Sequence, residues 1–362
     1  MALLKGADEK SRKTLRFRFP SAPLFQITPN IYGRCAKMSE ILALAIDNLM
    51  SPIVLSFALG LAASLARSDL TFPEAAAKAI SLYLLFAIGF KGGVSVADHG
   101  VDVTLGLSLL AGVVLSATLP FVAFMLLRLL SGMDRLNAAA VAGHYGSISI
   151  VTFVAATSVL EGRGISSEGY MVAVAAAMEA PAILSALWLV TRGEKGGRMD
   201  SQLWREILLN GSIVLLVGAF FIGWITGKEG LEEIDSFIVA PFKGVLCLFL
   251  LDMGLVAGRG MRRGRKALGP GSLAFGIFMP IIGSIFGLVA ALALGLSTGG
   301  ALLLMTLSAS ASYIAVPAAM RVALPEANPS IYLTLSLGVT FPFNLTIGIP
   351  LYLTVAQAMT GG

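Results

Sequence analysis

Long uninterrupted apolar runs constrain this chain more than any other feature. The run "VTLGLSLLAGVVLSATLPFVAFMLL", residues 103–127, holds no charge and shows no alternation. A membrane-crossing helix needs about 20 mainly apolar residues, whereas strands of a membrane barrel alternate apolar with polar. A helix also satisfies all the hydrogen bonds of its own backbone, which lipid cannot do. Of the 362 residues, 56% are hydrophobic and 13% charged, about half the charge of a soluble domain. We therefore expect an all-α, multi-pass membrane protein.

The apolar runs define ten candidate transmembrane helices. They cover about 51–66, 73–97, 103–131, 136–160, 167–191, 208–226, 233–258, 271–295, 298–322 and 329–358. The most polar interior stretch, "TRGEKGGRMDSQLWRE", follows the fifth candidate. We divide the chain into an extension (1–37), a first five-helix repeat (38–191), a linker (192–207) and a second five-helix repeat (208–362).

Weak internal similarity relates the two sets of five helices. "FAIGFKGGV" at 86–94 matches "LDMGLVAGR" at 251–259, and Pro120 matches Pro280 inside the third and eighth helices. Tyr170 likewise falls on Tyr332. These offsets are all about 160–165 residues and keep the same order. Because five is odd, the second copy enters the membrane from the opposite side, which predicts an inverted-topology repeat of the kind found in secondary transporters.

Basic residues predict the orientation. Ten spans place thirteen Lys and Arg on one side and three on the other, namely Lys91, Arg163 and Lys228. The basic side is expected to be cytoplasmic. The linker then faces the cytoplasm, and both termini lie outside the inner (plasma) membrane. We expect Lys78, Lys91 and Lys243 to snorkel toward a membrane face.

The first 37 residues contradict that charge pattern, because they carry eight Lys and Arg on the predicted outer side. A mistaken start codon, a targeting segment and a genuine tail are three explanations. The stretch lacks the apolar core of a secretory signal. We expect the protein to begin near Met38, with a disordered extension as the alternative.

Two serine-rich stretches interrupt the fourth and ninth helices at matching positions. They are "GHYGSIS" at 143–149 and "LSASASY" at 307–313. Broken helices at membrane depth line cavities; their N-terminal ends attract anions and their freed carbonyls bind cations. Hydroxyls can bind a small oxyanion. The candidate substrate ligands are Gly146, Ser147, Ser149, Thr152, Ser308, Ser310 and Ser312, and we expect Ser149 to face Ser312. The alternative is close helix packing by small residues.

Carboxylates inside the spans are candidate cation ligands, because a charge in the membrane is costly. Glu179 lies mid-span in the fifth helix, and Asp252 lies in the seventh, nearer a basic loop. Asn344 follows Pro342 and could offer an amide to the substrate. His144 could bind the anion or sense protons, but a hydrogen bond to the backbone is the simpler expectation.

Three functional classes are compatible with these features. A secondary transporter agrees with paired polar interruptions. An intramembrane hydrolase built on Ser147 would need a histidine partner, and "GHYGS" supplies no separate one. A passive channel would need a continuous polar path. No Walker A, HExxH, CxxC or dinucleotide motif occurs, so we expect no enzyme activity, no catalytic residue, no cofactor, no metal except a possible sodium ion, and no nucleic-acid partner.

Several of these motifs resemble the sodium-dependent bicarbonate transporter family, the permeases of the cyanobacterial type. "SPIVLSFALGLAASL" is similar to its first helix, "IGFKGG" to the end of its second, "GHYGSIS" to its broken fourth and "MEAPA" to its fifth. The C-terminal "LPEANPSIYL" and "GIPLYLTVAQAMTGG" are the most specific matches. The resemblance implies ten helices in two inverted repeats, outside termini and a homotrimer. It also implies sodium-coupled import of a small anion, bicarbonate first, and regulation by a PII-like protein.

This chain departs from the family in its ninth helix. Tyr313 stands where the resemblance implies an acidic residue, and "VPA" at 316–318 replaces Gly-Pro-Pro. The fifth-helix acid is Glu179 instead of Asp. A sodium- or proton-coupled permease for another small organic or inorganic anion therefore remains the alternative.

Overall fold

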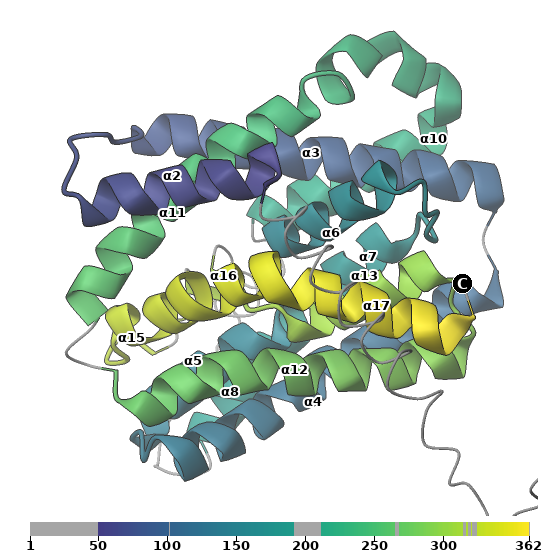
Figure 1. The fold of residues 1–362 in the computed structure, drawn as a ribbon. Coiled ribbons are helices and arrows are strands. Elements are labelled where there is room, and N and C mark those ends of the chain that lie inside the picture. The colour runs from purple at the N-terminus through teal and green to yellow at the C-terminus, as the bar shows by residue number, and fades with distance from the viewer. Residues whose placement is uncertain are drawn as a thin grey trace, which may run out of the picture. The chain divides into compact units, whose positions relative to one another are not determined.

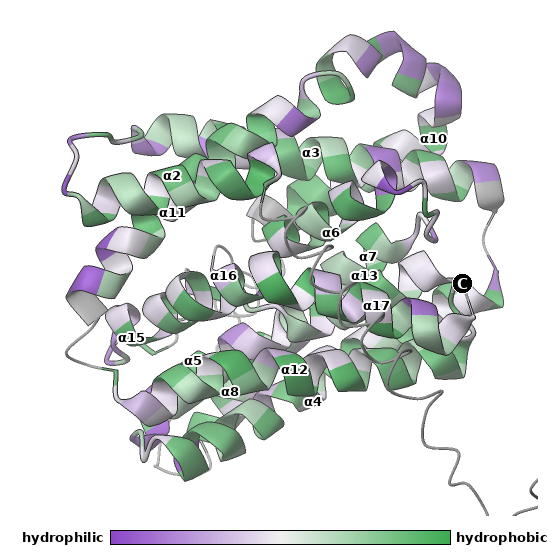
Figure 2. Ribbon diagram, in the orientation of Figure 1, coloured by the Kyte–Doolittle hydropathy of each residue, from purple (hydrophilic) through white to green (hydrophobic). Residues whose placement is uncertain are grey.

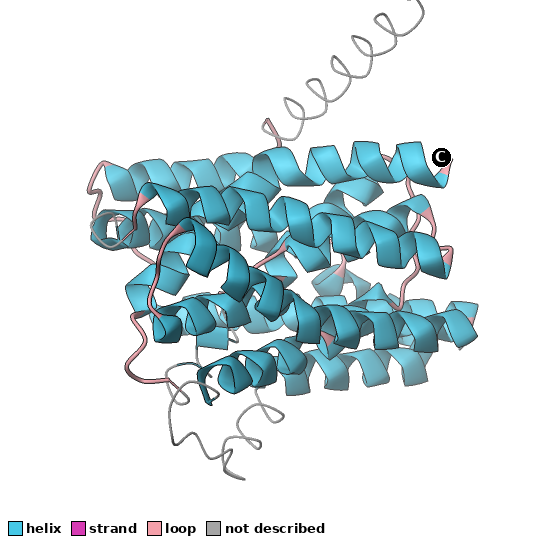
Figure 3. Cartoon of the chain, turned by 90° about the horizontal axis from the view of Figure 1, so that it is seen from below, coloured by secondary structure: helices cyan, strands magenta, loops and turns pink. Residues whose placement is uncertain are grey.

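The computed structural model describes residues 50–100, 102–191, 211–264, 268–313, 316–317, 320 and 324–361. Every regular element in these ranges is a helix, as expected (Figure 3). The predictions for the extension 1–37 and the linker 192–207 lie outside the described residues.

The first five predicted spans appear as seven helices. They are α2 (Pro52–Leu65), α3 (Glu74–His99), α4 (Val103–Leu130), α5 (Arg135–Gly146), α6 (Ile150–Gly162), α7 (Met171–Ala177) and α8 (Glu179–Thr191). Local caps fix several of their starts. The Asp102 side chain accepts the N–H of Leu105 at 2.8 Å, and that of Asp134 accepts the N–H of Asn137 at 3.0 Å. Carboxylates at such positions satisfy helix N–H groups that have no partner within the helix.

The second set comprises α10 (Gly211–Ile238), α11 (Phe242–Gly264), α12 (Pro270–Leu294), α13 (Thr298–Ala309) and a final composite helix. The seventh span was predicted to start at residue 233, and this was wrong. The polar sequence 228–235 continues α10 beyond a kink at Gly227, where φ is +59°. Only glycine adopts that backbone readily. Figure 2 shows this continuation as a mostly hydrophilic helical arch at the end of α10.

The last span contains two π-helical stretches. It runs through α15 (Pro329–Leu333), η1 (Thr334–Thr340), α16 (Phe341–Phe343), η2 (Asn344–Gly348) and α17 (Ile349–Thr360). Pro342 lies between the two π stretches, where its missing N–H disturbs the regular ladder. π stretches often mark functional positions in helices.

The helices pack in two groups. α2, α3, α10 and α11 pack on one another, with the α3–α10 and α2–α11 pairs the most extensive. α4, α5, α8 and α12 form the second group, and α6, α7, α13 and α17 lie between the two in the view of Figure 1. This arrangement places α13 against α6, α12 and α17.

The outer faces of the long helices are apolar (Figure 2). Val103, Leu129 and Ile225 are 77%, 73% and 81% exposed, a pattern that suits contact with lipid rather than water. Among the described residues, eight helical segments are long and apolar enough to cross a membrane, and the apolar helices α2 and α13 are shorter. The chain is therefore a multi-pass membrane protein.

Candidate functional site

The first predicted interruption separates α5 from α6. We call residues 147–149 the first non-helical segment. Ser147 and Ser149 both have extended backbone, with ψ of 157° and 106°. The Ser149 hydroxyl caps α6 by accepting the N–H of Thr152 at 3.2 Å, and it also accepts the Thr152 hydroxyl at 2.9 Å. These side chains are buried.

The second predicted interruption follows α13. We call residues 310–312 the second non-helical segment. Ser310 has extended backbone with ψ of 164°. Its hydroxyl donates to the carbonyl of Leu307 at 2.9 Å, inside the last turn of α13. The ninth span was expected to continue to residue 322, but most residues from 314 to 323 lie outside the described ranges.

The two non-helical segments contact each other directly. The N–H of Ser149 donates to the Ser310 hydroxyl at 2.8 Å. The N–H of Ser312 donates to the carbonyl of His144 at 2.7 Å. The structure thus brings the two serine-rich stretches together. The partner of Ser149 is Ser310, two residues before the Ser312 that we expected.

Glu179 lies beside this contact. It is the first residue of α8, and the Ser147 hydroxyl donates to its Oε2 at 2.8 Å. The side chain is 8% exposed. None of the described Lys, Arg or His residues forms an ion pair with it. A buried carboxylate without a basic partner is costly, and oxygen ligands around it suit a hard cation such as sodium.

Ser116 of α4 holds the junction between α7 and α8. Its hydroxyl donates to the carbonyl of Met178 at 2.6 Å and accepts the N–H of Ala182 at 3.1 Å. Pro181 lacks an N–H and so cannot continue the helix ladder there. Ser116 therefore supports the backbone on both sides of Glu179.

Several buried polar atoms near the contact find no hydrogen-bond partner among the described residues. They include the hydroxyls of Thr306, Ser308 and Tyr313 and the Nε2 atom of His144. The Tyr313 hydroxyl faces the Ser149 side chain without the geometry of a hydrogen bond. Buried polar groups normally have partners. Such hydroxyls beside the contact can bind a polar ligand.

Asn344 reaches the contact region but supports α13. Its amide donates to the carbonyl of Ala309 at 2.9 Å, and its oxygen accepts the Tyr352 hydroxyl at 2.9 Å. The bond to Ala309 satisfies a carbonyl that the end of α13 leaves free. Its substrate-binding role stays a prediction.

His144 forms a hydrogen bond to the backbone, which was the simpler of the two expectations for it. Its Nδ1 atom lies 2.7 Å from the carbonyl of Ala140. Its ring stacks on Tyr332, with centroids 4.5 Å apart. The contact to Ala140 assigns the proton to Nδ1, since a carbonyl can only accept.

Asp252 is buried in α11, which packs on α2. Its charged neighbour is Arg259 of the same helix. No hydrogen bond or ion pair joins it to either non-helical segment in the described ranges. The structure therefore does not bring Asp252 to Glu179, and its cation-binding role stays a prediction.

Sequence reasoning gave no site role to Ser116, Thr306 or Tyr313. Ser116 had one usable signal, because it lies four residues before Pro120 in a mainly apolar helix. Tyr313 was noticed only as a departure from a family pattern. Thr306 carried no signal, since single hydroxyls are common in membrane helices.

Gly146 provides a direct test of how tightly this region packs. A β-carbon there would overlap the Pro120 ring and the Ser116 carbonyl. We expect Gly146→Ala to lower the free energy of unfolding by about 1–3 kcal/mol, seen as a lower melting temperature of the purified protein. Gly162→Ala is the matched control, because among the described residues no atom of another helix or of a distant part of the chain lies within 4 Å of the added carbon. Equal melting temperatures for the two variants would contradict the packing described.

Comparison with known proteins identifies the family of the chain. No curated protein matches the chain. The family profile of the Na⁺-dependent bicarbonate transporter superfamily matches residues 52–357, which span all the described helices except the last residues of α17. The chain therefore belongs to the Na⁺-dependent bicarbonate transporter superfamily.

Proposed function

We propose that this chain is a symporter that couples sodium to the import of a small anion, with bicarbonate as the first candidate. One observation carries the proposal. Two buried, hydroxyl-rich non-helical segments from distant parts of the chain contact each other beside a buried carboxylate that has no basic partner among the described residues. Family membership supports the sodium dependence and the substrate class.

The anion site is the region around the two non-helical segments. The proposed ligands are Gly146, Ser147, Ser149, Thr152, Ser308, Ser310, Ser312 and Asn344. The N-terminus of α6 begins at Ile150, and its N–H groups and dipole favour negative charge. Hydroxyls that donate and accept suit a hydrogen carbonate ion, which can do both. Tyr313 adds a neutral hydroxyl where the family resemblance implied a carboxylate.

The sodium site is the neighbourhood of Glu179. Its carboxylate, the Ser147 hydroxyl and main-chain carbonyls near Pro181 are the oxygen donors that a sodium ion requires. Occupation by a cation would offset the cost of the unpaired carboxylate. Because Ser147 also belongs to the first non-helical segment, the cation and the anion would share one element. That sharing accounts for coupling between the two ions.

A hydrolase is the weaker candidate. Ser147 donates its hydroxyl to Glu179, and His144 is directed to Ala140. The serine and histidine therefore do not form the hydrogen-bonded pair that an activated nucleophile requires.

Uptake by reconstituted protein tests the proposal. Proteoliposomes should accumulate labelled bicarbonate when sodium is present outside, and much less when potassium replaces it. A pH gradient without sodium and unlabelled competitor anions distinguish the alternative of a proton-coupled permease or another anion. If bicarbonate accumulates equally with and without a sodium gradient and a pH gradient, the symport proposal is wrong.

The inverted repeat of 38–191 and 208–362 is part of this proposal. The packing supports it, because exchange of the two repeats maps the α3–α10 contact onto the α11–α2 contact. The same exchange maps α4–α5 onto α12–α13, which also pack together. A homotrimer and a PII-like regulator, implied by the family resemblance, complete the proposal. Native mass spectrometry and co-purification would test them.

The orientation gives a prediction with a clear readout. If the basic side is cytoplasmic, a single cysteine at Gly196 in a cysteine-free background should resist an impermeant thiol reagent added to intact cells. A cysteine added after Gly362 should react readily. The reverse labelling pattern would invert the proposed topology.

A further inference from the structure

Tyr313 is a buried residue whose ring has a fixed place beside the proposed anion site. It directly follows the second non-helical segment and is 8% exposed. Its ring packs edge-on against Phe341 of α16, with centroids 5.5 Å apart. Phe341 packs in the same way on Phe57 of α2, with centroids 5.1 Å apart. These apolar contacts hold the ring and leave the phenolic hydroxyl as the only polar group of the side chain.

The hydroxyl of Tyr313 lacks an acceptor. It faces the Ser149 side chain, yet no described residue forms a hydrogen bond with it. The Ser149 oxygen already accepts the N–H and the hydroxyl of Thr152, at 3.2 and 2.9 Å. A hydroxyl oxygen has two acceptor lone pairs, so none is left for the Tyr313 proton. Even if Ser149 donates its own proton to the tyrosine oxygen, the tyrosine proton remains a buried donor without an acceptor.

This unused donor lies at the N-terminus of α6, a helix of 13 residues with Ser149 as its N-cap. Ile150 and Val151 are in its first turn, where the N–H groups have no acceptor within the helix. The partial positive charge of a helix N-terminus also favours an anion. The tyrosine hydroxyl and the helix N–H groups are thus donors in one buried place, and an acceptor-rich ligand would satisfy them.

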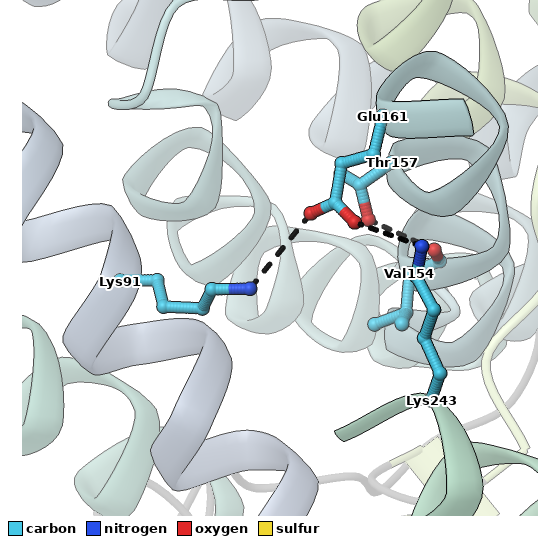
Figure 4. Close-up of polar contacts among 5 residues, drawn as sticks. All are labelled: Lys91, Val154, Thr157, Glu161 and Lys243. Carbon is cyan, nitrogen blue, oxygen red and sulfur yellow. Dashed lines mark hydrogen bonds and ion pairs between the residues drawn. The ribbon is translucent and has the colours of Figure 1, made fainter. Parts of the chain in front are cut away.

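The donors at this place are electrically neutral. No Lys or Arg side chain among the described residues bonds to either non-helical segment. The lysines that pair with α6 lie at its opposite end, where Lys91 Nζ and Lys243 Nζ are 3.8 and 3.7 Å from the Glu161 carboxylate (Figure 4). In the Born description the cost of burying an ion rises with the square of its charge, and neutral donors offset less of that cost than a basic side chain does. The nearby carboxylate of Glu179 adds repulsion, so the place suits an anion with one negative charge.

We propose that the Tyr313 hydroxyl is a direct ligand of the transported anion and that, with the neutral donors at the N-terminus of α6, it selects singly charged oxyanions over doubly charged ones. The location of the anion rests on the proposed function. The role of Tyr313 goes beyond it, because anion transport through this site does not by itself require the tyrosine.

Tyr313→Phe removes the hydroxyl and keeps the ring that contacts Phe341. We expect the bicarbonate concentration for half-maximal uptake into proteoliposomes to rise about tenfold, the effect of one lost hydrogen bond to a charged ligand. The melting temperature in bicarbonate-free buffer should stay equal or rise, because the variant loses a buried hydroxyl that has no partner. A lower melting temperature with unchanged half-maximal concentration would assign the hydroxyl a structural role and overturn the inference.

Tyr145 supplies the matched control. It is also buried, and its ring packs edge-on against Phe275, with centroids 4.8 Å apart. Its hydroxyl, however, shares a hydrogen bond of 2.7 Å with the Thr340 hydroxyl. Tyr145→Phe should therefore lower the melting temperature and leave the half-maximal bicarbonate concentration unchanged. If Tyr313→Phe behaves in the same way as this control, the inference is wrong.

Competition with labelled bicarbonate tests the selection by charge. Formate carries one negative charge and sulfate carries two. We expect sulfate to compete with bicarbonate for uptake about tenfold more weakly than formate, or more weakly still, because the site lacks a basic side chain to offset the second charge. Equal competition by the two ions, including none by either, would contradict the selection.

Thermal unfolding separates this inference from the proposed function. Bicarbonate should raise the melting temperature of the wild type in nanodiscs, since a ligand stabilises the state it binds, and Tyr313→Phe should need about tenfold more bicarbonate for the same rise. If this difference is seen but the wild type does not transport, the symport proposal fails and the role of Tyr313 stands. If both proteins transport with the same half-maximal concentration, the role of Tyr313 fails and the symport proposal stands.

Discussion

Glu179→Gln is expected to raise the sodium concentration for half-maximal uptake by about a hundredfold or more. Glutamine keeps the shape and can still accept the Ser147 hydroxyl, which lies 2.8 Å from the carboxylate oxygen. It removes the buried charge that would bind the cation. Loss of one member of a buried charge pair costs about 3–5 kcal/mol, and 1.4 kcal/mol corresponds to about tenfold in affinity. Uptake measured over a sodium series tests this.

Thermal unfolding separates this loss from misfolding. In sodium-free buffer the glutamine variant should be at least as stable as the wild type, because it buries no unpaired charge. Sodium should then raise the melting temperature of the wild type only, since a ligand stabilises the state it binds. The exposed carboxylate Glu232 supplies the control substitution, Glu232→Gln. If sodium stabilises the glutamine variant as well, Glu179 has a structural role instead.

Ser149→Ala and Ser312→Ala are each expected to weaken anion binding by about ten- to a hundredfold. A lost hydrogen bond to a charged ligand costs about 1.5–3 kcal/mol. The contact of Ser312 with His144 uses its backbone N–H, which alanine keeps. The Ser312 hydroxyl also accepts the N–H of Val316 at 3.4 Å, and this long bond is the structural contact that alanine removes. The anion concentration for half-maximal uptake measures the effect.

Ser149 needs an additional variant because its hydroxyl also caps α6. Alanine at an N-cap costs about 1 kcal/mol of stability, whereas Ser149→Thr keeps the cap and the hydroxyl. The threonine variant should therefore recover most of the affinity that alanine loses. Ser336→Ala is the control, because Ser336 is buried and its hydroxyl donates to the carbonyl of Tyr332, one turn earlier in the same composite helix, at 2.7 Å. Unchanged affinity in both alanine variants would make the two segments packing motifs.

Most helix positions could be predicted from the sequence, because an apolar run in a membrane allows one secondary structure. α4 and α12 agree with their predicted ranges within one residue at each end. The end of α10 could not be predicted in this way. The polar stretch 228–235 reads as a loop by hydropathy, yet the structure continues it as helix past Gly227. A hydropathy pattern indicates which residues are buried in lipid. It does not indicate whether a polar stretch outside the lipid is helical.

The candidate site could be predicted as a region, but its contacts could not. Clustered glycines and serines marked both non-helical segments, since small polar residues inside apolar runs are unusual. The pairing of Ser149 with Ser310 depends on the three-dimensional crossing of α6 and α13. The roles of Ser116 and Asn344 depend on which carbonyls the neighbouring helices leave free. Such choices are set by tertiary packing, which one sequence does not encode in local patterns.

The two bonds made by the second non-helical segment have a mechanical consequence. Ser310 binds Ser149 of the first segment, and Ser312 binds His144 of α5, so the second segment is tied both to the first segment and to the helix before it. Pulling the second segment away from the first segment and from α5 would leave buried N–H and C=O groups unpaired, at a cost of about 1–3 kcal/mol for each group. In the proposed transport cycle, the less costly motion would therefore move α5, α6 and α13 together as one rigid body relative to the group formed by α2, α3, α10 and α11. The bound anion would then travel within one intact site instead of passing between two separating segments.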